Sequence, residues 1–327
     1  MKLIICGNGF DKNHGLKTDY NDYKQFVKDE YPREYKDFEN FLYSSFPKKN
    51  KWNDLEKSLT FDYNKCISDC IQHYFKEGKI SADLRLLEMQ VEIEEQTRFI
   101  YNLTGRYFYE WLSQIDLTKA ESNHEFSQDD LFVTFNYTNL LEEIYKIDPG
   151  NIFHIHGNFY DIESSNLFNA NRITLPSVNT IEDAETNELI HVDEINCDTI
   201  KRKIQFGSIY NDSKSARSVI KKEYSELDFY STIIQPSSKP IMGFIDSASK
   251  KIEANYSKLK VFVDNEDVDE VVIMGHSLLG GDIKYYEHIL VPLFKGCNWT
   301  LYYHEDDTES IMFVDKFSLK KADFINW

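Results

Sequence analysis

The feature that most constrains this chain is a set of short apolar runs, each followed by a polar or glycine-containing motif. The runs are KLIIC at residues 2–6, DLFVTF at 130–135, NIFHI at 151–155, DEVVIM at 269–274 and NWTLYY at 298–303. Short runs that are apolar on both faces are typical of strands buried in a parallel sheet. We therefore predict an α/β fold with a parallel sheet flanked by helices.

Helical spacing of apolar side chains dominates the region between the first two runs. We interpret residues 18–117 as a large N-terminal helical insertion, and Thr18 or Asp19 is suited to cap its first helix. Further helices are predicted over residues 139–145 and after Gly281.

Residues 158–203 are polar, with few periodic apolar positions, and we interpret them as a loop or lid. Short strand candidates lie near residues 188–190 and 204–207. No internal repeat of 20 to 50 residues is visible. All 327 residues are therefore assigned to a single domain.

The charge balance argues against one class of partner. The chain carries 37 Lys+Arg against 55 Asp+Glu, a formal net charge of −18, and its basic pairs are scattered. A protein that binds nucleic acid needs clustered positive charge, so a nucleic acid partner is not expected. An anionic ligand would have to be held by local backbone donors.

The cysteines and the hydropathy indicate a cytoplasmic protein. Five cysteines with no Cys-x-x-Cys pair favour reduced thiols and give no zinc motif. No apolar run is long enough to cross a bilayer, and no signal sequence is visible. We expect no membrane association and no bound metal.

Four motifs follow directly after apolar runs. They are Gly7-Asn8-Gly9, Asn136-Tyr137-Thr138, His156-Gly157 and Gly275-His276-Ser277-Leu278. In open parallel sheets, ligands bind outside the carboxyl ends of the strands. The motifs are therefore predicted to meet at one edge of the sheet and form a ligand site.

The first motif resembles half of a dinucleotide-binding fingerprint. Gly7-x-Gly9 would allow a tight turn and a close approach of the backbone, from Gly7 to Phe10, to a phosphate. The full G-x-G-x-x-G is absent, and a simple glycine turn is the alternative. The next helix is expected to begin between Phe10 and Thr18. Asp11 and His14 could contact a ligand or cap the turn.

Asn136 and His156 are candidate catalytic residues. Asn136 could hold a water or a ribose hydroxyl, or it could order the turn after its strand. His156 could exchange a proton near neutral pH, or it could be a buried, hydrogen-bonded histidine. His154 shares the face of His156 and is expected to be structural. A metal held by this pair is conceivable, although no third ligand stands out.

The last motif, Gly275-His276-Ser277-Leu278, precedes Asp282 and a helix. Small residues there would let a dinucleotide pass, and Ser277 could bond a phosphate or a ribose. As a hydrolase elbow the pattern should read G-x-S-x-G, but the last glycine comes one residue late.

Together these motifs resemble the bacteriophage abortive-infection AbiH family, from residue 3 to about residue 290. The resemblance is carried by the following stretches: Gly7 to Asp11, His14-Gly15-Leu16, Thr18, Tyr20, Trp52, Leu55-Glu56, Leu59, Thr134 to Thr138, His154 to Gly157, and Gly275 to Leu278.

That family is in turn similar to sirtuin-like, Rossmann-like NAD-binding domains. The similarity implies dinucleotide contact by Gly7, Asn8 and Gly9, with Phe10 and Asp11 beside them. It implies that Thr134-x-Asn136 holds the nicotinamide ribose, that His156 is the base, and that Gly275, His276, Ser277 and Asp282 contact NAD. The paired cysteines of the sirtuin zinc module are absent, and Thr138 stands where sirtuins commonly have Asp.

The resemblance implies an anti-phage effector that binds NAD as its substrate and cleaves it, with release of nicotinamide. Two alternatives remain. One is a module that senses NAD, ADP-ribose or another nucleotide without turnover, and the other is a nucleic-acid-directed defence effector. A phage-derived trigger and a homo-oligomer are the expected partners.

Overall fold

A computed structural model describes residues 1–40, 105–158 and 252–327 apart from 264, 265 and 281, with isolated residues between these ranges. Most of the predicted insertion at 18–117 and almost all of the predicted loop at 158–203 lie outside the described residues. The strand candidates near 188–190 and 204–207 also lie outside them.

Six strands form one parallel sheet in the order β3-β2-β1-β4-β5-β6. Their bounds are β1 Lys2–Cys6, β2 Leu131–Thr134, β3 Ile152–His154, β4 Glu270–Met274, β5 Asn298–Tyr303 and β6 Ala322–Asn326. The five predicted strands are confirmed to within one residue at each end. β1 is central, because Leu3 lies opposite Leu131 of β2 on one side and Val271 of β4 on the other.

Helices connect the strands wherever the chain is described. Between β1 and β2 lie α1 Asn8–Asn13, α2 Tyr20–Glu30, α3 Pro32–Glu39 and α7 Arg106–Leu112. Between β2 and β3 lies α8 Leu140–Glu143, and α13 Ile252–Phe262 precedes β4. Between β4 and β5 lie α14 Ile283–Tyr285, a π turn Tyr286–Leu290 and α15 Val291–Phe294, and between β5 and β6 lies α16 Thr308–Phe317. None of the helices described has the length and apolar character that a bilayer crossing requires.

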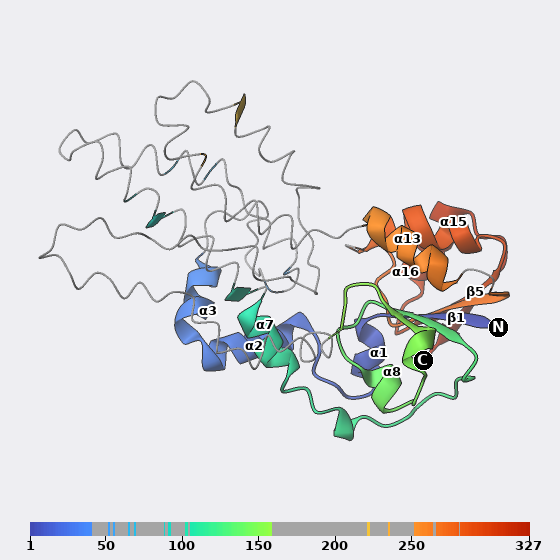
Figure 1. Ribbon diagram of the computed structural model, residues 1–327, viewed down its shortest axis with the longest axis horizontal. Helices are drawn as coiled ribbons and strands as arrows, with labels where there is room; N and C mark the ends of the chain where they lie inside the picture. Colours follow the sequence, from blue (N-terminus) through green and yellow to red (C-terminus); the bar gives the residue numbers. More distant parts are fainter. Residues whose placement is uncertain are drawn as a thin grey trace, which may run out of the picture.

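The helices cover both faces of the sheet (Figure 1). Leu3 and Ile5 of β1 pack into a core cluster that contains Phe313 of α16 and other residues of α13 to α15. Ile4 and Cys6 belong to a second cluster, with Phe10 of α1 and residues of α8. Both faces of β1 are buried, which is why its sequence is apolar without alternation.

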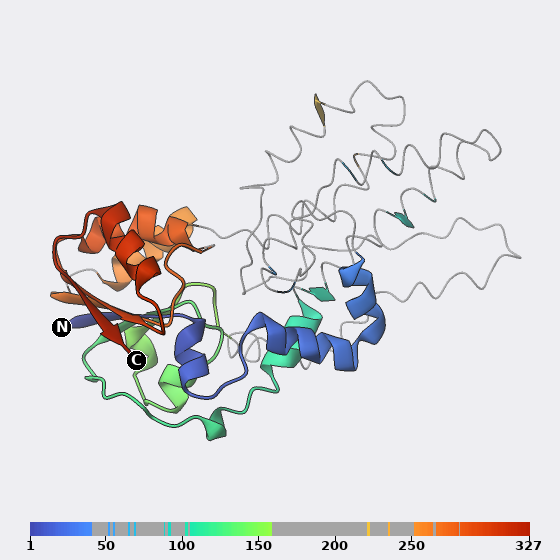
Figure 2. The ribbon, with the colours of Figure 1, turned by 180° about the vertical axis from the view of Figure 1, so that it is seen from behind.

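The helices α2, α3 and α7 lie together to one side of the sheet (Figure 2). Asp19, one of the two predicted caps, is the N-cap of α2 and accepts hydrogen bonds from the backbone N–H groups of Asn21 and Asp22. Tyr23 is fully buried against Phe108 and Trp111, so the aromatic residues of this region form a local core.

One predicted helix start differs from the structure, and three elements were not predicted. The helix after the first glycine motif begins at Asn8, with Gly7 as its N-cap, and not between Phe10 and Thr18. β6, α13 and α16 were not predicted. The β6 sequence, ADFIN, escaped notice because β6 is a largely exposed edge strand with no continuous apolar run.

Candidate functional site

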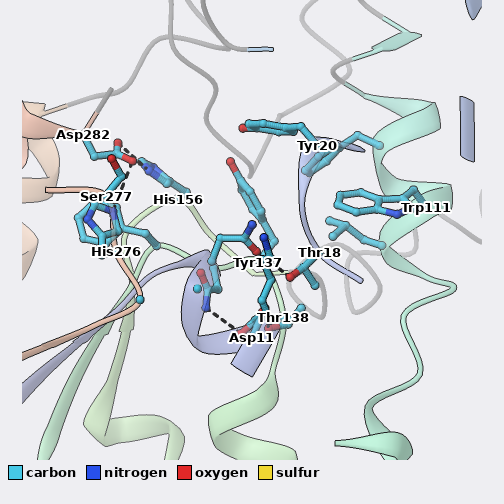
Figure 3. A pocket seen from close by; sticks show the side chains of 18 residues that line it. Asp11, Thr18, Tyr20, Trp111, Tyr137, Thr138, His156, His276, Ser277 and Asp282 are labelled. Carbon is cyan, nitrogen blue, oxygen red and sulfur yellow. Dashed lines mark hydrogen bonds and ion pairs between the residues drawn. The ribbon is translucent and has the colours of Figure 1, made fainter. Parts of the chain in front are cut away.

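The carboxyl ends of the first four strands open into a cavity of about 370 Å³ (Figure 3). Asn8 and Asp11 follow β1, Asn136 follows β2, His156 follows β3 and His276 follows β4, and all five line the cavity. The structure therefore brings side chains from the four motifs together at one edge of the sheet.

Nine of the twelve predicted site residues line this cavity: Asn8, Gly9, Asp11, Asn136, His156, Gly275, His276, Ser277 and Asp282. The other three, Gly7, Phe10 and Thr134, are not among its lining residues. Phe10 is buried among aromatic rings, including Tyr145, and the Thr134 hydroxyl accepts a hydrogen bond from the Asn136 N–H at 3.1 Å.

The glycines join two loops of the site. A Cβ on Gly275, whose φ is +66°, would lie 2.1 Å from the Phe10 nitrogen, and a Cβ on Gly9 would lie 2.7 Å from the Gly275 Cα. A Cβ on Gly7 would lie 2.5 Å from the His276 Cα. Contacts this short exclude any side chain, so these glycines allow the loops after β1 and β4 to pack backbone against backbone.

This packing also uses the backbone donors expected to hold a phosphate. The Gly7 N–H donates to the Met274 carbonyl at 3.0 Å, and the Gly9 N–H donates to the Gly275 carbonyl at 2.7 Å. The Phe10 N–H donates to the Gly7 carbonyl at 2.8 Å. Three of the four backbone donors from Gly7 to Phe10 are thus engaged within the chain.

Asp11 lies on α1 beneath the cavity and is 1% exposed. Its Oδ1 accepts a hydrogen bond from the Asn136 Nδ2 at 2.8 Å, and its Oδ2 accepts one from the Thr138 Oγ1 at 2.7 Å. Burial raises the pKa of the Asp11 carboxyl from 3.8 to about 7, although both hydrogen bonds act in the opposite direction. The carboxyl can therefore change its charge near neutral pH.

A second cluster lies at the ends of β3 and β4. The His156 Nε2 is 3.2 Å from the Asp282 Oδ1, and the His276 Nε2 is 3.7 Å from the Asp282 Oδ2. An ionised carboxylate only accepts hydrogen bonds, so the His156 Nε2 is the protonated nitrogen. Asp282 can then stabilise a second proton on His156, which is what a general base requires.

Tyr286 orients the other histidine of this cluster. Burial raises the pKa of the Tyr286 hydroxyl well above its usual value, so the hydroxyl keeps its proton. It lies 3.0 Å from the His276 Nδ1. When the hydroxyl donates to Nδ1, the remaining N–H of a neutral His276 faces Asp282.

Ser277 contacts a carboxylate of α16. Its Oγ donates to the Glu309 Oε1 at 3.1 Å, and the Leu279 N–H donates to the same oxygen at 2.8 Å. A second cavity of about 530 Å³ lies on this side of the loop. Gly9, Lys12, Gly275, His276 and Ser277 line both cavities, so the two spaces adjoin across the β4 loop.

Aromatic side chains from helices beside the sheet complete the first cavity. Tyr20 of α2 and Trp111 of α7 lie across the cavity from His156 and Asp282 in Figure 3. Tyr137 lies between them and stacks on His156, with ring centroids 6.2 Å apart. Sequence reasoning missed this wall, because an aromatic residue at helical spacing is equally typical of a core.

The other two histidines of the motifs have structural partners. The His14 Nδ1 donates to the Phe10 carbonyl at 2.6 Å and its Nε2 contacts the Tyr145 hydroxyl, so His14 fastens the end of α1. The His154 Nε2 contacts the Glu142 Oε1 at 2.8 Å. β3 ends at His154, so the strand alternation expected to place His154 and His156 on one face stops before His156.

Comparison with known proteins gives one result. A family model described as bacteriophage abortive infection AbiH matches residues 3–303, which is most of the chain. No curated protein and no solved structure matches it.

Proposed function

Because this chain belongs to the bacteriophage abortive infection AbiH family, we propose that it is an anti-phage effector that binds NAD and cleaves it, releasing nicotinamide. The observation that carries the proposal is the cavity at the carboxyl ends of β1 to β4, where Asn136 and His156 lie with two carboxylates, Asp11 and Asp282. A trigger of phage origin would activate such an effector.

The sheet topology supports a dinucleotide ligand. The strand order β3-β2-β1-β4-β5-β6 is that of Rossmann-like dinucleotide-binding domains, in which the ligand lies where the order reverses. In this chain that point falls between β1 and β4. The two adjoining cavities, about 370 and 530 Å³, lie there and offer room for two nucleoside halves.

The Asp282 carboxylate in the first cavity suits the proposed chemistry. Cleavage of the bond between the ribose C1′ and the nicotinamide nitrogen leaves positive charge on the sugar, and carboxylates stabilise such a transition state. The bond electrons leave with nicotinamide, which departs neutral and needs no general acid. The same negative charge would direct the pyrophosphate toward Lys12, which lines both cavities.

The remaining step is the addition of water to C1′. The oxygen of water bonds to the sugar, and one of its protons must be accepted. We assign that proton to His156, whose imidazolium the Asp282 carboxylate would stabilise at 3.2 Å. The products are nicotinamide, ADP-ribose and a proton, so the reaction is balanced.

The test is release of nicotinamide from NAD by the purified protein, alone and in extracts of phage-infected cells. We expect His156→Ala to lower kcat by about 10²-fold or more, the usual contribution of a general base. Asn136→Ala should lower kcat by about tenfold, roughly the value of one hydrogen bond. Asp29→Ala is the matched control, since Asp29 is an exposed carboxylate of α2 that bonds only Gln25 among the described contacts.

A sensor that binds NAD without turnover is the second candidate, favoured by the burial of His156, which is 2% exposed. NAD binding by calorimetry without nicotinamide release under any trigger would favour it, especially if both variants kept their defence activity. If the protein neither binds NAD nor releases nicotinamide from it, both the NAD-cleaving effector and the NAD sensor are excluded.

A further inference from the structure

We propose that Asp11 is a positioning residue, which fixes the Asn136 amide so that its oxygen accepts a hydrogen bond from a ribose hydroxyl. The identity of the ligand rests on the proposed function, whereas the orientation of the amide rests on contacts within the chain.

Both hydrogens of the Asn136 amide are engaged. Its Nδ2 donates to the Gly7 carbonyl at 3.0 Å and to the Asp11 Oδ1 at 2.8 Å. A carbonyl oxygen can only accept, so the nitrogen and not the oxygen must face Gly7. Asn136 lines the cavity, and the group it has left to offer a ligand is the acceptor Oδ1.

Asp11 itself is poorly placed to contact a ligand. It is 1% exposed, and each of its oxygens already accepts a hydrogen bond, from Asn136 and from Thr138. Its effect on a ligand is therefore transmitted through Asn136. Thr138 in turn fixes the Asp11 carboxyl, because its hydroxyl donates a hydrogen bond to Oδ2 while Asn136 donates to Oδ1.

The fixed orientation selects the chemistry of the ligand. Rotating the amide would place the Asn136 oxygen about 3 Å from the Gly7 carbonyl oxygen, where two acceptors face each other without a proton. A ligand group that meets the Asn136 oxygen must therefore be a donor. A ribose hydroxyl can donate, whereas a phosphate oxygen or a carbonyl cannot.

The orientation can be measured without any ligand. With ¹⁵N-asparagine labelling, the Asn136 side-chain amide should exchange with solvent at least about tenfold more slowly than that of exposed Asn21. Asp11→Ala should remove most of this protection, whereas Asp11→Asn should keep it, because the new amide oxygen still accepts. Asp29→Ala should have no effect on it.

The wild-type protein alone can overturn the proposal. If its Asn136 amide exchanges as fast as that of Asn21, Asp11 does not fix it, whether or not the Asp11→Ala variant folds. Unchanged protection in a folded Asp11→Ala protein would be equally decisive against the proposal.

The consequence for turnover is a coupling between Asp11 and one hydroxyl. The assay compares NAD with analogues that lack the 2′- or the 3′-hydroxyl of the nicotinamide ribose. Wild type should lose about tenfold in kcat on one analogue, roughly the value of one hydrogen bond. With NAD as substrate, Asp11→Ala should lower kcat by about tenfold relative to wild type and change KM by less than about twofold. Replacing NAD by that analogue should lower the kcat of Asp11→Ala little further.

If the fall in kcat from the Asp11→Ala substitution and the fall from the missing hydroxyl simply multiply, the two groups act independently and the coupling is overturned. If the wild type does not turn over NAD at all, the proposed function fails, and the exchange measurement still decides whether Asp11 positions Asn136.

Discussion

The two polar clusters of the cavity differ in how tightly they are held. In the Asp11 cluster, hydrogen bonds of 2.7 to 3.0 Å engage both carboxyl oxygens and both amide hydrogens of Asn136. In the Asp282 cluster the contacts to His156 and His276 are 3.2 and 3.7 Å, and the Asp282 side chain is 17% exposed. The first cluster is suited to hold a ligand in place, and the second is suited to move protons.

The largest effect should come from breaking the contact that joins the two clusters. Gly275→Ala places a Cβ 2.1 Å from the Phe10 nitrogen at a positive φ, so we expect a loss of about 4 kcal/mol in the free energy of unfolding. Gly15→Ala is the matched control, since Gly15 also has a positive φ of 75° but no atom within 4 Å of its Cβ. That variant should lose only about 1 kcal/mol. Urea denaturation measures both, and equal losses would show that the loops are not packed as described.

The second effect is on stability and isolates the Asp11 cluster. The pKa of Asp11 is about 7 in the folded protein and about 3.8 when unfolded. Stability from this group is therefore complete below pH ~4 and is lost as the pH rises through ~7. In Asp11→Asn the side chain does not titrate. The free energy of unfolding of this variant relative to wild type should therefore increase by roughly 4 kcal/mol between pH 4 and pH 8. Parallel stability curves for the two proteins would contradict the raised pKa.

The smallest effect should come from the looser cluster. Asp282→Asn keeps the shape of the side chain but removes the charge that would stabilise a protonated His156. On the proposed function we expect kcat for NAD to fall by about tenfold, the value of one hydrogen bond to a charged group, with little change in the urea midpoint. A fall as large as that of His156→Ala would mean that Asp282 itself takes part in proton transfer.

The strands could be predicted because a strand that is buried on both faces has a continuous apolar sequence. LIIC at residues 3–6 and VVIM at residues 271–274 are apolar throughout, and nothing else in the chain is needed to recognise them as buried strands. The gathering of the motifs at one edge also follows from a general property of parallel sheets.

The pairing within the site could not be predicted, because the partners are far apart in the chain. Asp11 and Asn136 are separated by 125 residues, and His156 and Asp282 by 126. Periodicity reports which face of an element is apolar, but not which polar groups meet across the fold. For the same reason, the first glycine motif did not indicate that Gly9 packs against Gly275 and Gly7 against His276.

The central place of β1 bears on how the protein is made. Of the six described strands, β1 leaves the ribosome first, although it needs two later partners, and the Lys2 N–H reaches Asp130, 128 residues further on. The amino group of Met1 reaches Asp269, 268 residues further on. A chain released before β4 lacks His276, Ser277 and Asp282, so the cavity is completed only late in synthesis. Products of translation that stop before β4 would therefore carry β1 without a finished site, and only chains that extend past Asp282 would contain the complete cavity.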